Sequence, residues 1–198
     1  MPVFDATTQA HLEERKGTNA KVLLWFRTRN RETGAPETLG FWSGDDHQEF
    51  LINGEVRTYY GAGNVINVPP LVVAPGFQTR YYRVTIPPFT DEVKTLLQAY
   101  EPRLATVEIH SICFELNGGR PTGDPVRVFK GFLNQAPEEL GAKGGTSRTE
   151  LTLATAARRL THGLPLKRSG DELKRRNPND RGREYSDVAG DWTVPWGT

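Results

Sequence analysis

Cysteine and histidine are scarce in this chain, and their scarcity excludes several kinds of site. The 198 residues include one cysteine, Cys113, which excludes an internal disulfide framework and any zinc or iron–sulfur site built from several cysteines. The four histidines are scattered along the chain, and no serine lies in a G-x-S-x-G motif. Because no nucleophile, base and orienting group can be named together, we expect no enzymatic activity and no cofactor.

Long apolar runs are also absent. No run approaches the roughly 20 residues that a membrane-spanning helix requires, and the first residues lack the basic-then-apolar order of a secretory signal. We therefore expect synthesis in the cytosol and no membrane insertion.

Glycine and proline are abundant, with 20 and 14 copies, and they favour a β-rich chain with many turns. Asn53-Gly54 lies between two strand-like runs and predicts a tight hairpin with a type I′ turn. Because helical segments are few and do not alternate with strands, we expect a mainly β (α+β) fold, an antiparallel β-barrel or sandwich with one inserted helix across an open end. The expected elements are a short N-terminal helix over residues 4–16 capped by Asp5, strands over 21–29 and 39–43, the hairpin over 49–60, a strand over 78–86, a helix between Thr90 and Pro102, and strands over 103–116, 126–134 and 150–155.

The longest expected strand, over residues 103–116, contains two residues with reactive side chains. Cys113 follows the apolar alternation of the strand, so we expect it in the core. His110 is interpreted as a hydrogen-bonded polar group within the strand rather than as a catalyst.

Two other segments raise the question of a ligand site. Residues 141–147 (GAKGGTS) are glycine-rich, as phosphate-binding loops are, but Lys143 does not directly precede Ser or Thr and a strand is expected to follow, so we interpret them as a hairpin loop. Asp45, Asp46, His47 and Glu49 offer ligand types suited to a divalent cation. We favour a solvated turn for these four, with a cation site as the alternative.

The C-terminal part of the chain is basic and ends in aromatic residues. Between Arg158 and Arg183 it carries nine Lys/Arg and three Asp/Glu, although the whole chain has a net charge of only +1. Such a division of charge favours an arm that binds a complementary surface on a neighbouring copy, another protein or nucleic acid, and tryptophan side chains supply apolar anchors. A solvated terminus that packs on its own domain is the alternative. The expected partner-binding residues are Arg158, Arg159, Lys167, Arg168, Lys174, Arg175, Arg176, Arg181, Arg183, Tyr185, Trp192 and Trp196.

The order of short segments along the chain is familiar from one group of proteins. The chain contains, in sequence, residues 22–26 (VLLWF), 30–34 (NRETG), the pair Asp45-Asp46, 52–54 (ING), 58–60 (TYY), 82–86 (YRVTI), 105–109 (ATVEI), 128–133 (VFKGFL), 180–182 (DRG) and 195–197 (PWG). In this order they resemble the N-terminal hub region of tail proteins from tailed phages and gene transfer agents. The closing segments are similar to tails seen among phage baseplate proteins.

The resemblance implies a structural virion protein of the tail tip, made in the host cytoplasm. A baseplate hub of this kind is typically a trimer, with a hexamer as the other possibility, and joins the tail tube or distal tail protein to the central fibre or tip protein. Genomic DNA would pass through its lumen without specific binding. Longer hub proteins can carry a cysteine-rich C-terminal region with an iron–sulfur cluster, for which this chain has neither the length nor the cysteines. It therefore stands as a minimal hub or as a neighbouring tip component.

These observations define one main hypothesis and two others. The main hypothesis is a non-catalytic tail hub with a β-barrel core over residues 1–157 and an extended basic and aromatic arm over residues 158–198 that grips neighbouring subunits. The alternative is a nucleic-acid-binding β-barrel protein that uses the basic arm on phosphates. We place it second because the aromatic residues of the arm follow the basic ones instead of interleaving with them. A hydrolase is third, since no catalytic constellation is visible.

Overall fold

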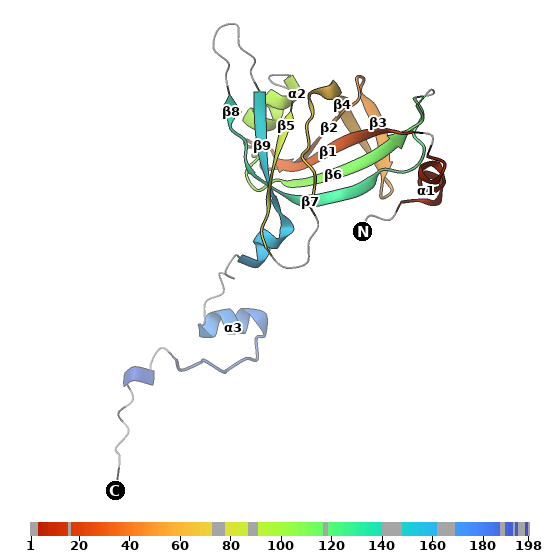
Figure 1. Ribbon diagram of the computed structural model, residues 1–198. Helices are drawn as coiled ribbons and strands as arrows, with labels where there is room; N and C mark the ends of the chain where they lie inside the picture. Colours follow the sequence, from red (N-terminus) through yellow and green to blue (C-terminus); the bar gives the residue numbers. More distant parts are fainter. Residues whose placement is uncertain are drawn as a thin grey trace. The chain divides into compact units, whose positions relative to one another are not determined.

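The computed structural model describes residues 4–15, 17–72, 78–86, 91–116, 119–139, 148–161, 169–186, 189–191, 193 and 197 (Figure 1). By its internal contacts the chain forms two units, residues 1–159 and residues 160–198. The first unit contains every strand of the described residues. Among the helices of the described residues, none combines the length and the apolar character that crossing a membrane requires.

The first unit is mainly β, as the sequence predicts. Its strands are β1 (Asn19–Arg29), β2 (Pro36–Trp42), β3 (Gln48–Ile52), β4 (Glu55–Gly61), β5 (Tyr81–Ile86), β6 (Thr106–Phe114), β7 (Val126–Gln135), β8 (Glu138–Glu139) and β9 (Arg148–Thr155). The helical segments are α1 (Ala6–Glu13), η1 (Gly63–Val65), α2 (Asp91–Lys94), the π-helical turn η2 (Thr95–Ala99) and η3 (Ala156–Thr161).

The N-terminal helix and the hairpin at Asn53-Gly54 form where the sequence predicts them. Asp5 caps α1, and its carboxylate accepts a hydrogen bond from the backbone N–H of Thr8 at 3.4 Å, which satisfies one of the free donors of the first turn. Strands β3 and β4 are joined by Asn53 and Gly54, whose φ angles are +52° and +80°. Both values are positive, as a type I′ turn requires, and this turn matches the twist of the two strands.

The strands form one mixed sheet in the order β3-β4-β2-β1-β6-β7-β9-β5, with β8 paired to β9. All neighbouring pairs in this order are antiparallel except β2 and β4, which run parallel over two residue pairs. The segment that follows β4 also reaches the far edge of the sheet. Asn67 and Thr85 of β5 exchange two backbone hydrogen bonds, at 3.1 and 3.0 Å.

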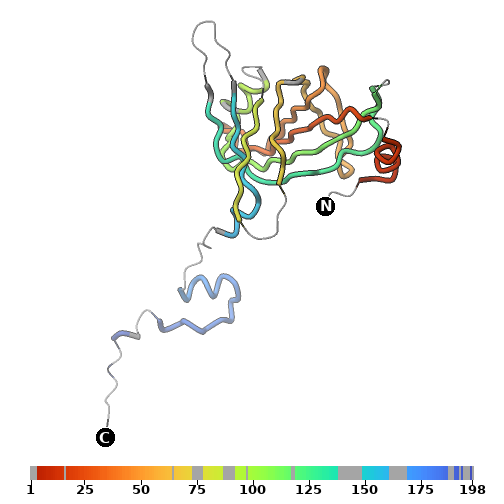
Figure 2. The backbone as a smooth tube through the Cα atoms, in the orientation of Figure 1, coloured from red at the N-terminus to blue at the C-terminus, as the bar shows by residue number. Residues whose placement is uncertain are grey.

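The larger hydrophobic core lies on one face of this sheet. Side chains from β2 and from β5 belong to the same buried cluster although these strands are far apart in the strand order, so the sheet is strongly curved (Figure 2). Val93 and Leu96 of the α2–η2 segment are buried in this cluster, which is the placement that the sequence predicts for the inserted helix. Thr90, at the start of the expected helix, lies outside the described residues.

A second, aromatic cluster lies on the opposite face, under the β3–β4 hairpin. Alternate residues of β1 point to the two faces, so Leu24 and Phe26 join the larger core while Leu23 and Trp25 join the second. The other members of the second cluster are Trp42, Phe50, Ile52, Tyr59, Ile112 and Phe114.

Strand β6 is shorter than expected. It begins at Thr106, whereas the sequence predicts a strand from residue 103, and with nine residues it is shorter than the eleven of β1. Leu104 has a φ of +60°, a left-handed conformation that interrupts an extended strand. Cys113 is buried, as predicted.

Candidate functional site

Among its described residues, the second unit contains the α-helix α3 (Gly170–Arg176) and a short 3-10 segment, η4 (Ala189–Asp191); the sequence interpretation does not include α3. Ser169 caps it by accepting a hydrogen bond from the backbone N–H of Glu172 at 3.3 Å. Asp171 and Glu172 lie in its first turn, and three basic residues lie in its last turn. Both placements favour a helix because they complement its dipole. The cap was visible in the sequence as a serine followed, after Gly170, by two acidic residues.

This helix has no buried residue. Among the described residues of the unit, Leu160 is 67% exposed and Tyr185 is 57% exposed. An isolated helix of seven residues is unstable in water, and the described part of this unit provides no core that would support it.

Three of the predicted partner-binding cations of this unit are paired with carboxylates inside it. Arg175 contacts Glu172 at 2.8 Å, Arg181 contacts Glu184 at 2.5 Å and Lys174 contacts Glu184 at 3.7 Å. The hydrogen bond from Arg181 holds the pKa of the Glu184 carboxyl below its ordinary value. These pairs are exposed, so each contributes little to stability.

The other predicted partner-binding residues fall in three places. Arg176, Arg183 and Tyr185 are exposed in the second unit. Arg158 and Arg159 belong to the first unit, where Arg158 donates a hydrogen bond to the Asn134 side chain and the Arg159 guanidinium lies 5.1 Å from the centre of the Phe132 ring. The remaining four, Lys167, Arg168, Trp192 and Trp196, lie outside the described residues.

Cationic side chains gather on one exposed face of the first unit, along β1 and β7. The strand register aligns Arg27 with Thr106 and Thr106 with Phe132, and the neighbouring row aligns Glu108 with Lys130. Because alternate residues of a strand share a face, Arg29 lies on the same side as Arg27. We call this the basic face; its residues are Arg27, Arg29, Arg103, Arg127, Lys130 and Arg159.

Three residues of the basic face, Arg27, Arg29 and Arg103, line a recess of about 230 Å³ together with Glu101 and Leu104. Arg27, Arg127 and Lys130 are each about half exposed. Three carboxylates lie against the face: Glu55 contacts Arg27 at 3.3 Å, Glu108 contacts Lys130 at 3.2 Å, and Glu101 accepts a hydrogen bond from the Arg103 backbone at 3.1 Å. Because the face has six cations against these three carboxylates, it carries a local excess of positive charge.

A buried ion pair lies beside this face, and the sequence analysis missed it. Arg57 and Glu108 have exposed fractions of 3% and 4%, and a guanidinium nitrogen of Arg57 lies 3.0 Å from a Glu108 carboxylate oxygen. Arg57 also contacts Glu55 at 2.9 Å and lies 5.1 Å from the centre of the Trp25 ring. A sequence signal existed, since a glutamate in the middle of an apolar strand requires a buried cation.

The charge state of Glu108 follows from these contacts. Burial alone would raise its pKa, but the hydrogen bonds from Arg57 and Lys130 outweigh burial, so the pKa lies below the ordinary value. The Lys130 ammonium lies 3.2 Å from the second carboxylate oxygen and the Arg127 guanidinium lies 3.8 Å from it. Glu108 is therefore ionised at neutral pH and links the buried pair to the exposed cations.

His110 differs from its sequence interpretation. It is buried, and neither ring nitrogen has a hydrogen-bond partner among the described residues, so the expectation of a hydrogen-bonded histidine was wrong. The aromatic cluster around it supplies few acceptors, because Leu23 and Ile112 are its apolar neighbours on that face. Burial lowers the pKa of His110 to about 4, which keeps the ring neutral at physiological pH.

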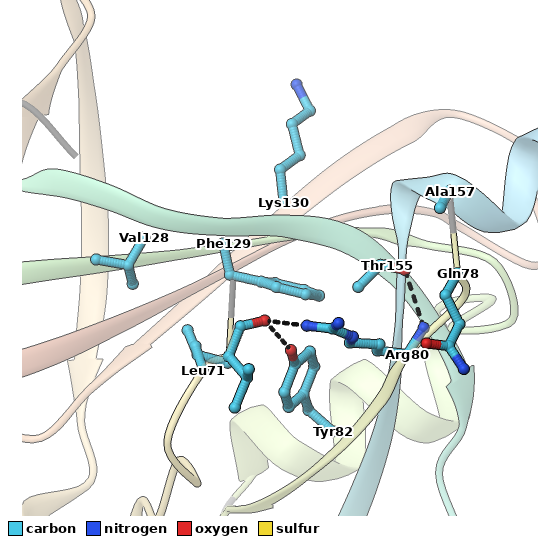
Figure 3. Close-up of a pocket in the computed structure, with 10 residues that line it drawn as sticks. Leu71, Gln78, Arg80, Tyr82, Val128, Phe129, Lys130, Thr155 and Ala157 are labelled. Atoms are coloured by element: carbon cyan, nitrogen blue, oxygen red, sulfur yellow. Dashed lines mark hydrogen bonds between the residues drawn. The ribbon is translucent and has the colours of Figure 1, made fainter. Parts of the chain in front are cut away.

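A second recess, of about 240 Å³, opens beside β5 and β7 (Figure 3). Its polar groups bind one another: an Arg80 guanidinium nitrogen and the Tyr82 hydroxyl both donate to the Val72 carbonyl, at 2.7 and 3.0 Å. Lys130 points away from the recess in Figure 3. No nucleophile and base meet among the described residues that line it.

The cation site considered for residues 45–49 does not assemble in the described part of the chain. No group of three or more His, Cys, Asp or Glu side chains there is placed to hold a metal ion. His47 uses its Nδ1 atom to accept a hydrogen bond from the backbone N–H of Gly61 at 3.3 Å. The loop over residues 141–147 lies outside the described residues.

Comparison with known proteins does not assign the chain to a family. No protein-family model matches the chain, and no curated protein matches it significantly.

Proposed function

We propose that this chain is a structural component of a phage-type tail tip, a baseplate hub that works as a closed ring of identical subunits. The first unit forms the body of each subunit, and the second unit binds a neighbouring subunit. The proposal includes no catalysis and no cofactor.

The observation that carries the proposal is the exposure of the second unit. Helix α3 has no buried residue, and Leu160 and Tyr185 are largely exposed. A short helix persists only when another surface packs against it. A neighbouring subunit supplies such a surface in a ring, and linked contacts then reinforce one another.

The curvature of the first unit supports a barrel-like hub module. Its sheet curves around the larger hydrophobic core, and the hydrogen bonds between Asn67 and Thr85 connect the segment after β4 to the opposite edge. A hub module that closes into a barrel would leave fewer exposed strand edges. The assignment to a tail tip, the trimeric or hexameric state and the neighbours (the tail tube or distal tail protein and the central fibre) rest on the resemblance in segment order.

Nucleic-acid binding through the arm is the second candidate. It has weaker support because Lys174, Arg175 and Arg181 are already paired with Glu172 or Glu184. Paired cations contribute less to the positive potential that attracts phosphates.

Removal of residues 160–198 tests the proposal. The remaining chain keeps both hydrophobic clusters, so we expect a folded monomer where the full chain forms oligomers, as measured by light scattering. A matched control is Tyr81→Ala in the full chain, which removes an exposed aromatic side chain from the first unit and leaves association unchanged. Equal oligomeric states with and without residues 160–198 would contradict the proposal.

A further inference from the structure

The two ends of strand β1 carry opposite charge. The part of the basic face around the recess, with Arg27, Arg29 and Arg103, lies where β1 ends. Toward the other end, Val22 is hydrogen-bonded to Ser43, which Gly44 separates from the exposed residues Asp45 and Asp46. From Val22 to Arg29 an extended strand spans about 23 Å. One copy therefore cannot bring its own acidic turn onto its own basic face.

The acidic turn is held rigidly. The indole N–H of Trp42 donates to the Asp46 carbonyl at 2.7 Å, and the backbone N–H of Gly63 donates to the Gly44 carbonyl at 2.9 Å. Gly61 packs so closely that an added Cβ would lie 2.3 Å from the Asp45 carbonyl oxygen. The backbone thus fixes Asp45 and Asp46 while their side chains stay exposed. One nearby cation, Lys21, donates to the Ser43 carbonyl at 3.1 Å.

The hairpin that follows this turn carries exposed apolar side chains at its far end, where Glu55 contacts Arg27 of the basic face at 3.3 Å. Leu51 and Val56 are directly paired across β3 and β4 and are both exposed, and Glu49 lies on the same outer side. The basic face offers Leu104, also exposed, at the rim of its recess. The basic face therefore joins positive charge to exposed apolar side chains, and the acidic turn supplies charge of the opposite sign, as the two sides of a protein interface do.

We propose that the basic face of one copy binds the acidic turn, Asp45, Asp46 and Glu49, of a second copy. The near-neutral chain supports this partner, because a positive excess on one surface leaves a matching negative excess elsewhere on the same molecule. A contact between two different surfaces of identical subunits is head-to-tail and closes into a ring when its rotation permits. The inference rests on the assembly function proposed above. It names the surfaces through which the first units of two neighbouring copies meet.

Charge reversal in the full chain tests this contact. Arg29→Glu with Arg103→Glu reverses the charge at the recess of the basic face without touching the buried ion pair, and Asp45→Lys with Asp46→Lys reverses the charge of two of the three acidic residues. Each double variant should weaken self-association about tenfold or more in sedimentation at low salt. The chain that carries all four substitutions should recover association, because the reversed surfaces again complement each other. Arg83→Glu with Arg120→Glu, at two exposed arginines outside the face, is the matched control and should associate as the unmodified chain does.

The outcomes separate the contact from the assembly itself. Loss in both double variants with recovery in the fourfold variant supports the contact. Unchanged association in the folded double variants, checked by circular dichroism, overturns the contact while the assembly function stands. An unmodified chain that stays monomeric overturns both. Unchanged association combined with lost retention of a fluorescent oligonucleotide by the Arg29→Glu, Arg103→Glu variant overturns the contact and shows that the basic face binds polyanions.

Discussion

The buried Arg57–Glu108 pair gives the sharpest prediction for the first unit. Glu108→Gln removes the negative charge but keeps the shape of the side chain. It leaves the Arg57 guanidinium at 3% exposure with Glu55 as its remaining carboxylate, 2.9 Å away. Breaking a buried pair from one side costs about 3–5 kcal/mol. Glu55 still compensates in part, and Lys130 can turn to solvent, so we expect a loss of about 3 kcal/mol in the free energy of unfolding.

Urea unfolding measures this loss. With a slope of about 2 kcal/mol per molar, the midpoint should fall by about 1.5 M. Arg127→Gln is the matched control, since its guanidinium lies 3.8 Å from the same carboxylate and is about half exposed; it should cost less than about 1 kcal/mol. A loss below about 1 kcal/mol for Glu108→Gln would refute the reasoning that the pair is buried and coupled.

The pH dependence gives an independent check on the same carboxylate. The pKa of Glu108 in the folded chain lies below its ordinary value of 4.5. A lowered pKa means that the pair stabilises the fold above that ordinary value and that the contribution is lost as the pH falls through the folded pKa. The urea midpoint of the unmodified chain should therefore fall on acidification below about pH 4.5 more steeply than that of Glu108→Gln.

Two further substitutions test the core. The pKa of His110 is lowered from 6.5 to about 4, so on acidification the unfolded chain binds the proton before the folded chain does. The free energy of unfolding therefore falls by about 3 kcal/mol as the pH decreases from 6.5 to 4. His110→Phe should flatten this part of the stability curve, measured by urea unfolding. An unaltered curve would show that the ring is not buried neutral. Gly131→Ala should cost about 1–3 kcal/mol, because its Cβ would lie 2.2 Å from the Ala154 carbonyl oxygen. Gly34→Ala, in open space at a φ of +69°, should cost about 1 kcal/mol by backbone strain alone, and equal costs for the two glycine variants would argue against the close approach of β7 and β9.

Local signals in the sequence predict much of the first unit. Asn53-Gly54 determines its hairpin because few other pairs adopt two positive φ angles, and Asp5 marks the start of α1 by its capping side chain. The alternation in β6 identifies the buried Cys113. These features depend on neighbours within a few residues, so composition and spacing are sufficient to predict them.

Long-range features were not predictable in the same way. The parallel pairing of β2 with β4 and the second aromatic cluster depend on how the hairpin folds over β1. Arg57 and Glu108 are 51 residues apart in sequence, and no local pattern links them. Arg158 and Arg159 look like part of a basic arm in the sequence, but Asn134 and Phe132 bind them to the first unit. The basic face likewise combines residues from two strands, the segment before β6 and η3.

The mass of the full chain in solution tests the central claim most directly. Native mass spectrometry over a range of concentrations should show a discrete assembly of three or six copies of the 22.1 kDa chain. A single copy at every concentration, or an open series of masses without a preferred number, would contradict a closed ring of subunits.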